Sequence, residues 1–336
     1  MYIPPGLKLL AERADAILGR WRLPAAREEN ALIVFYLHGI IDDRRRTEVD
    51  PSDQLSRGFV RADDFRRLVT DFLARGYTFV SPDDILKGLG PGGKYVMMTF
   101  DDGYWNNQYC LPVLNEFRTP AVFFIAPGYI IENRCFWWDV VCRERRKSGA
   151  SARAIAGEID ALKRTKIPEI ENYITTQFGS ESFRPGSDAE RPFTVAELKD
   201  FARCRYVVIG NHTYHHANLS ICTDDEIRQE IRSAQDALEK MTGEKPVALS
   251  YPGGKYRWAA VETAEELGLQ MALTIDPSKN FLPLGPHPEN RMVLGRYALF
   301  GDRRSLERQC IIARSGISMR RWLKRFLSAS AVQRRS

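Results

Sequence analysis

The feature that most constrains the fold is an alternation, from residue 31 onward, of short apolar segments with segments of helical amphipathic period. Residues 31–37 form an apolar run of strand length. Six later runs have the same character: 77–80, 95–100, 121–125, 206–209, 248–251 and 271–275. Between the first two runs, apolar side chains recur at helical spacing from Phe65 to Leu73, and Gly76 ends the pattern. Strands separated by helices in this way are typical of parallel sheets.

About seven strand–helix units in one chain predict an α/β fold, a distorted (β/α) barrel of about seven parallel strands with the plan of a TIM barrel. We assign the barrel to residues 31–300, after an N-terminal helical segment (1–30) and before a basic C-terminal tail (301–336). Residues 143–192 are charged, helical in period and rich in Gly, Ser and Pro near their end. We therefore expect them to form a helical insertion on the barrel rather than a separate domain.

The positive charge of the chain is concentrated at its C-terminus. The net charge is +6, yet residues 303–336 hold ten Lys or Arg and one acid, a net of +9, so the preceding 302 residues sum to −3. The body therefore lacks the basic character of a nucleic-acid-binding protein. In the tail, Arg and Lys alternate with Trp322, Leu323, Phe326 and Leu327, a pattern most often found in a solvated basic tail. Contact of this tail with an anionic membrane surface is the alternative.

The sequence predicts neither an export signal nor a membrane-spanning segment. Leu9 and Leu10 are followed at once by charged residues, which leaves no apolar stretch for a secretory signal. No apolar run approaches the ~20 residues that cross a bilayer. The six cysteines lack C-x-x-C spacing and are interpreted as reduced thiols. We expect a cytoplasmic protein, associated peripherally with the inner face of the membrane through its tail.

Three polar or glycine-rich clusters each follow a predicted strand directly: Asp101-Asp102-Gly103, residues 212–216 and Pro252-Gly253-Gly254. Because the strand C-termini of a parallel barrel open on one face, we expect these clusters to converge. His212 and His216 are four residues apart, which can place two imidazoles on one side of a helical turn, and Asp102 would complete a His₂–carboxylate set for a divalent metal. The alternatives are histidines with capping or packing roles, and aspartates that cap a helix at 104–107.

Together, Thr99-Phe100-Asp101-Asp102-Gly103 and His212-Thr213-Tyr214-His215-His216 resemble the first two signature motifs of the polysaccharide deacetylases, the NodB-homology family. The resemblance implies that Asp101 is the general base. It also implies that Asp102, His212 and His216 hold a divalent metal, zinc first, with Co²⁺, Ni²⁺ and Mn²⁺ as alternatives. His215 occupies a variable position of the motif and inherits no role.

Ser250-Tyr251-Pro252-Gly253-Gly254 is similar to the third motif of the family. This similarity implies that the Gly253 N–H helps to bind the oxyanion and that Tyr251 belongs to the substrate site. Many members carry an Arg two residues before the Pro of this motif, paired with the base. Ser250 occupies that position here, so we expect Arg296 or Arg291 to take the role.

The general acid is the least defined part of the predicted site. The late Leu-x-His motif that supplies it in the family is absent, and His287 lies in a Pro- and Gly-rich stretch that predicts a loop. His38 ends the first predicted strand. Certain deacetylases of exported exopolysaccharide carry a Tyr-His near this place, and the local sequence here is Tyr36-Leu37-His38. We therefore take His38 as the candidate acid.

The resemblance covers roughly residues 31–300 and implies a metal-dependent hydrolase. Its expected partner is an N-acetylated glycan, and its reaction is the removal of N-acetyl groups from amino sugars of a polysaccharide, oligosaccharide or glycan precursor. An amidase or deformylase acting on another sugar substrate, or a catalytically silent glycan-binding protein, are the alternatives. The run Phe136-Trp137-Trp138-Asp139 predicts either a stacking surface for sugar rings or the packing of a loop.

Overall fold

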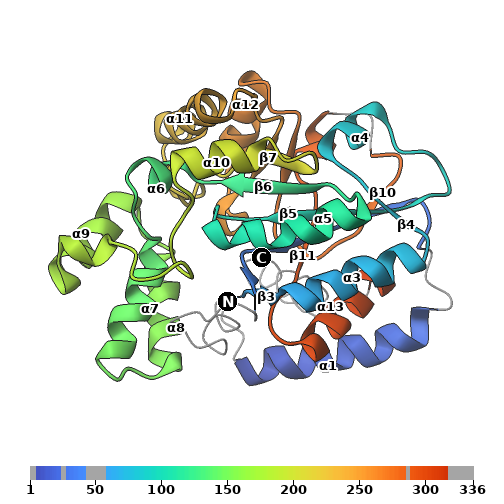
Figure 1. Cartoon of the computed structure of the whole chain (residues 1–336), viewed down its shortest axis with the longest axis horizontal. Helices are drawn as coiled ribbons and strands as arrows, with labels where there is room; N and C mark the ends of the chain where they lie inside the picture. The colour runs from blue at the N-terminus through green and yellow to red at the C-terminus, as the bar shows by residue number, and fades with distance from the viewer. Residues whose placement is uncertain (1–4, 24–27, 43–57, 285–287, 317–336) are drawn as a thin grey trace, which may run out of the picture.

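The computed structural model describes residues 5–23, 28–42, 58–284 and 288–316 (Figure 1). His287 and the basic segment after Gly316 therefore lie outside the described residues, and their predicted roles stay predictions. Among the helices in these ranges, none is both long and apolar enough to cross a membrane.

A nine-stranded sheet, mostly parallel, forms the centre of the molecule (Figure 1). Seven of its parallel strands follow the predicted positions: β1 (Ala31–Leu37), β4 (Tyr77–Phe79), β5 (Lys94–Phe100), β6 (Ala121–Ile125), β7 (Val207–Asn211), β8 (Ala248–Ser250) and β9 (Met271–Leu273). Six of them are neighbours in the order β1-β5-β6-β7-β8-β9, and β4 pairs with the first half of β5. The predicted barrel of about seven parallel strands is confirmed.

The chain after β9 brings the two ends of this row together. Leu294 forms a parallel bridge with Leu273 of β9, and β11 (Tyr297–Ala298) pairs in parallel with β1. β10 (Asn280–Phe281) pairs antiparallel with the start of β1, and a separate pair joins β2 (Ile40–Ile41) to β3 (Val60–Arg61). The sheet is thereby curled into a distorted barrel, with the C-terminal ends of its parallel strands gathered at one rim.

Successive side chains of β5 alternate between the two faces of the curled sheet. Met98 and Phe100 point outward into the largest apolar core, whereas Met97 points inward to a second apolar cluster. Thr99 and Asp101 continue the inward series, which takes the Asp101 carboxylate to the interior at the strand end. The period of two therefore decides that this acidic group is buried inside the barrel.

Helices cover the outside of the sheet. They are α3 (Ala62–Ala74), α5 (Leu111–Phe117), α6 (Pro127–Ile131), α10 (Val195–Ala202), α11 (Asp224–Thr242) and α12 (Trp258–Glu266). α4 (Pro82–Lys87) instead packs Ile85 into the inward apolar cluster. The described residues also form four short 3₁₀ helices: η2 (Trp105–Cys110), η3 (Ser180–Phe183), η4 (Pro252–Gly254) and η5 (Pro288–Arg291). α11 begins with a capping box between Thr223 and Glu226 and ends at left-handed Gly243.

Two groups of helices lie outside this arrangement. α7 (Trp137–Lys147), α8 (Ala152–Leu162) and α9 (Ile167–Phe178) project from one side of the barrel (Figure 1) and share an apolar cluster with Phe59, Tyr104 and Tyr129. α1 (Pro5–Arg22) packs against α13 (Arg303–Ser315), the last described helix, beside α3. The ends of the described chain therefore meet on one flank of the molecule.

A buried polar contact joins α11 to the end of β7. Gln235 accepts a hydrogen bond from Asn211 Nδ2 (2.9 Å) and donates one to the Pro246 carbonyl (2.6 Å). The Asn211 side chain in turn accepts a hydrogen bond from the Thr213 N–H (2.8 Å), so the contact extends to the loop that follows β7.

Replacing Gln235 with Met should destabilise the fold, because the Pro246 carbonyl loses a buried hydrogen-bond partner. We expect a loss of about 1–3 kcal/mol in the free energy of unfolding, measured by urea denaturation. Gln270→Met, at an exposed position, is the matched control and should stay within about 0.5 kcal/mol of the parent. Equal stability of the two variants would show that Gln235 contributes nothing beyond packing.

Candidate metal centre and active site

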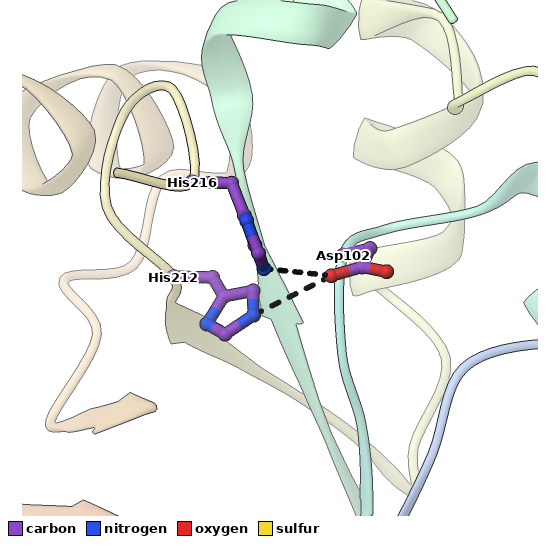
Figure 2. Close-up of side chains that lie close together, drawn as sticks. All are labelled: Asp102, His212 and His216. Atoms are coloured by element: carbon purple, nitrogen blue, oxygen red, sulfur yellow. Dashed lines mark ion pairs between the residues drawn. The ribbon is translucent and has the colours of Figure 1, made fainter. Parts of the chain in front are cut away.

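Three side chains from two strand ends converge at the rim of the barrel (Figure 2). Asp102 follows β5, and His212 and His216 lie in the loop that begins directly after β7. Asp102 Oδ1 is 3.5 Å from His212 Nε2 and 3.4 Å from His216 Nε2. The ligand atoms of the three residues lie within 4.8 Å of one another, which is close enough for all three to bind one ion.

The donor chemistry of these residues fits a divalent metal. Asp102 Oδ1 is buried and has no hydrogen-bond partner among the described residues, so an acceptor atom is left for a cation. His212 Nδ1 donates a hydrogen bond to the Ser250 carbonyl (2.7 Å), which leaves the lone pair on Nε2 directed at Asp102. Burial lowers the pKa of His216 to about 3, and the neutral imidazole is the form that binds metals.

The predicted helical turn between His212 and His216 is wrong. The residues form an irregular loop in which Thr213 (φ 60°) and His216 (φ 57°) are left-handed. The Asn211 side chain holds the Thr213 N–H, and the Thr213 hydroxyl accepts a hydrogen bond from the Ala217 N–H (3.0 Å). Such strained residues persist where their surroundings fix them, and here those local bonds set the conformation.

His215, to which the sequence assigned no role, is part of the support of this loop. The Glu230 carboxylate on α11 accepts hydrogen bonds from the His215 N–H (2.9 Å) and from His215 Nδ1 (2.8 Å). Burial opposes a charge on this ring, but Glu230 outweighs it and raises the pKa of His215 above its ordinary value. No local pattern in the sequence indicated Glu230, because the contact depends on how α11 packs against the loop.

Asp101 forms a bidentate ion pair with Arg296 inside the barrel. Arg296 Nη1 and Nη2 lie 2.7 and 2.8 Å from the two carboxylate oxygens, and both residues are buried. Burial by itself would raise the pKa of Asp101, but the guanidinium charge lowers the pKa below its ordinary value. Asp101 is therefore ionised at neutral pH, as an acceptor of protons must be.

Of the two arginines left open by the sequence, the structure brings Arg296 to Asp101. Arg291 instead donates a hydrogen bond to the Gln270 carbonyl (3.4 Å) at the surface. Ser250, which replaces the arginine of the third motif, accepts a hydrogen bond from Arg296 Nη2 (2.8 Å). A small side chain at that position thus helps to hold an arginine that arrives from a different part of the chain.

Tyr251 and Gly253, which were also predicted for the site, differ in their exposure and contacts. Tyr251 is buried, its hydroxyl donates to the Met292 carbonyl (3.1 Å), and its ring stacks on Tyr256, so the structure gives its side chain a packing role and does not bring it to the carboxylates. Gly253 is exposed and left-handed (φ 57°), a conformation that favours glycine. Its role as an oxyanion donor remains a prediction.

His38 directly follows β1, at the rim where the parallel strands end. A positive charge on its ring would lower the pKa of both Asp101 and Asp102, so the ring is within electrostatic reach of both. Its carbonyl accepts a hydrogen bond from Asn107 Nδ2 (2.6 Å), which holds the strand end against the loop that follows β5. These positions are compatible with a proton donor at this rim.

The structure decides against the capping role left open for Asp101 and Asp102. Asp101 and Asp102 do not cap the turn after β5, since η2 has Tyr104 as its N-cap and no side-chain cap.

In the aromatic run, Phe136 and Trp137 are buried in the core, but Trp138 is only partly buried and its ring meets His216 edge to face at 4.7 Å. Trp138 Nε1 donates to the Tyr104 hydroxyl (2.8 Å), which fixes the indole beside the metal site.

Comparison with known proteins identifies the family. The sequence profile of the polysaccharide deacetylases matches residues 89–272, more than half of the chain, and the chain belongs to this family. The Bacillus subtilis (strain 168) protein YxkH, provisionally named a polysaccharide deacetylase, is 27% identical over 207 residues, which are 60% of this chain and 53% of YxkH. The chain thus spans about half the length of that curated relative.

Solved structures of low sequence identity share the fold. The deacetylase PplD of Streptococcus pyogenes, in complex with acetate, has a TM-score of 0.55 at 16% identity, over 83% of this chain and 97% of PplD. IcaB from Ammonifex degensii has a TM-score of 0.56 at 18% identity, over 84% of this chain and 97% of IcaB.

Replacing Arg296 with Gln should raise the pKa of Asp101, because burial then acts without the opposing charge. The acidic limb of the pH profile of kcat/KM should move to higher pH, and the free energy of unfolding at pH 7 should fall by about 3–5 kcal/mol, since a buried carboxylate loses its partner. Arg296→Lys, which keeps the charge, should lie between this variant and the parent in both measurements.

Arg291→Gln is the matched control and should leave the pH profile in place, because Arg291 does not contact Asp101. The ion pair of Arg296 and Asp101 stabilises the folded protein at pH values above the pKa that an aspartate has in the unfolded chain. This stabilisation is lost as the pH falls through the lower pKa of Asp101 in the folded protein. An unshifted acidic limb in Arg296→Gln would show that Asp101 is not the group that titrates there.

Proposed function

We propose that this protein is a metal-dependent hydrolase that removes N-acetyl groups from amino sugars of a polysaccharide, oligosaccharide or glycan precursor. The observation that carries the proposal is the pairing of two adjacent carboxylates with different partners. Asp102 faces two imidazoles with an unpaired oxygen, whereas Asp101 is held ionised by Arg296. Family membership supports deacetylation as the reaction.

Asp102, His212 and His216 would hold the metal, for which we propose zinc first. Three protein ligands are typical of catalytic zinc sites, which keep a position open for water or substrate. When bound there, the metal supplies Lewis-acid polarisation of the amide carbonyl and of the attacking water.

The remaining steps belong to residues of the chain. Asp101, fixed by both nitrogens of the guanidinium fork, accepts the proton of the attacking water. The Gly253 N–H donates a hydrogen bond to the oxyanion that forms on the acetyl carbon, a contribution worth roughly 3 kcal/mol. His38 gives a proton to the departing amine, because an amide nitrogen leaves poorly as an anion. The products are acetate and a free amino sugar, and acetate is the molecule bound to the similarly folded PplD.

We also propose that the protein acts in the cytoplasm, at the inner face of the membrane. The basic tail of residues 317–336 supports this, because it carries six Lys or Arg, no acid and several large apolar residues. Glycan precursors made inside the cell would be accessible to an enzyme in this place.

Substitutions should separate the proposed roles of Asp101 and Asp102. Asp101→Asn should keep the bound metal but release acetate from N-acetylated chitooligosaccharides at least ~10²-fold more slowly, because the base is lost. Asp102→Asn should lose the metal, measured as metal content after dialysis, and a chelator should inactivate the parent until Zn²⁺, Co²⁺ or Mn²⁺ is added. Rapid acetate release by metal-free protein, or the opposite pattern of metal loss, would contradict these assignments.

His38 is tested separately from metal binding. His38→Ala should lower kcat with the metal content unchanged, and the basic limb of its pH–rate profile should disappear if the ring donates the proton. His287→Ala is the comparison, since it is the histidine nearest to the place of the family's late motif. Near-parental activity of His38→Ala together with inactivity of His287→Ala would transfer the role to His287.

A further inference from the structure

α1 carries a cluster of large apolar side chains on its outer surface. Ile17, Leu18 and Trp21 are 60%, 49% and 83% exposed. Positions 17 and 21 are four apart, and 18 and 21 are three apart, so the three side chains share one side of the helix. We call this cluster the α1 apolar patch.

The patch is exposed because of the way α1 packs. Asp15, Ala16 and Gly19 are buried on its inward side, and a Cβ on Gly19 would lie only 3.0 Å from Ile311 Cγ2 of α13. α1 therefore turns small and polar residues inward and large apolar residues outward, the reverse of an ordinary surface helix. Apolar side chains gathered on the outside in this way indicate a surface that meets another apolar phase or partner.

The surroundings of the patch favour a membrane with anionic lipids. Arg13 and Arg20 are exposed on the same helix, and Arg304 is exposed on the neighbouring α13, where Arg303 forms an ion pair with Glu307 (3.1 Å). A helix that presents Trp, Leu and Ile beside Arg side chains is typical of elements that lie at the boundary between lipid headgroups and acyl chains.

The sequence after α13 adds a second observation. A Cβ on Gly19 would also lie 3.0 Å from the Ser315 hydroxyl, so the end of α13 packs on the inward side of α1, opposite the patch. The chain continues from there into residues 317–336, which carry a charge of +6 with Trp322 and Leu323 among the basic residues. The sequence that follows α13 is therefore basic, as a contact with anionic lipids requires.

We propose that the α1 apolar patch is a membrane-docking surface that binds a bilayer containing anionic lipids, with Trp21 as its main apolar contact. This inference rests on the membrane association proposed above for the tail, and adds a folded contact to it. Cationic side chains and the tail attract the protein to the surface, and the patch then inserts its apolar side chains below the headgroups. The surface lies on a helix outside the barrel and contributes nothing to the cluster of Asp102, His212 and His216.

The test is cosedimentation of the full chain with vesicles of phosphatidylcholine and phosphatidylglycerol at low salt. Trp21→Ser should weaken the partition coefficient roughly tenfold, and Leu18→Ser in addition should weaken it further. Trp258→Ser is the matched control, because Trp258 is 51% exposed on α12, away from this flank, and should bind like the parent. Pure phosphatidylcholine vesicles should bind all forms poorly.

Other outcomes would overturn the proposal. Parental binding by Trp21→Ser, with loss of binding only in a chain lacking residues 317–336, would assign membrane contact to the tail alone. A dimer in sedimentation equilibrium that Trp21→Ser dissociates, without an effect on vesicle binding, would make the patch a contact between copies of the chain. Acetate release from a soluble oligosaccharide should be unchanged in Trp21→Ser, so a failure here is distinct from a failure of the proposed hydrolysis.

Discussion

The buried guanidinium of Arg296 is the interaction on which the rest of the site depends. A charge in this position is costly unless every donor is paired, and an arginine has five N–H groups. All five have acceptors here: both oxygens of Asp101, the hydroxyls of Thr99 and Ser250, and the carbonyl of Thr274. These partners lie on or next to β5, β8 and β9, whereas Arg296 directly precedes β11. The ion pair thus also ties the closing segment of the barrel to the strands that present the carboxylates.

This pairing explains how two adjacent aspartates can have different chemistry. Asp101 continues the inward series of β5 and meets the guanidinium, but Asp102 is left-handed (φ 78°), which turns its carboxylate away toward the histidines. Asp is among the residues that tolerate this conformation. Because Arg296 is already saturated by its five acceptors, it does not neutralise the unpaired oxygen of Asp102. A divalent metal would supply that charge.

The sequence predicted those parts of the fold that depend on local pattern. The strand at 31–37 and the helix that ends before Gly76 follow from periodicity alone, and the two motifs marked the right strand ends. The loop of His212 was predicted wrongly, because its left-handed residues are fixed by contacts with Asn211 and the Thr213 hydroxyl. The choice between Arg296 and Arg291 stayed open for the same reason, since a contact across 195 residues leaves no mark in local spacing.

The helices after α6 lie at the side of the barrel, yet α7 contacts the candidate metal centre. Its first turn carries Trp138, whose ring meets His216 edge to face, and its indole N–H is held by Tyr104, which in turn donates to Asp139 (2.6 Å). Tyr104 lies two residues after Asp102, so the same chain segment provides one candidate metal ligand and supports the wall behind another. Burial lowers the pKa of His216, and the Trp138 ring is one of the groups packed against its imidazole. The added helices therefore contribute to the wall of the candidate metal centre without contributing a ligand to it.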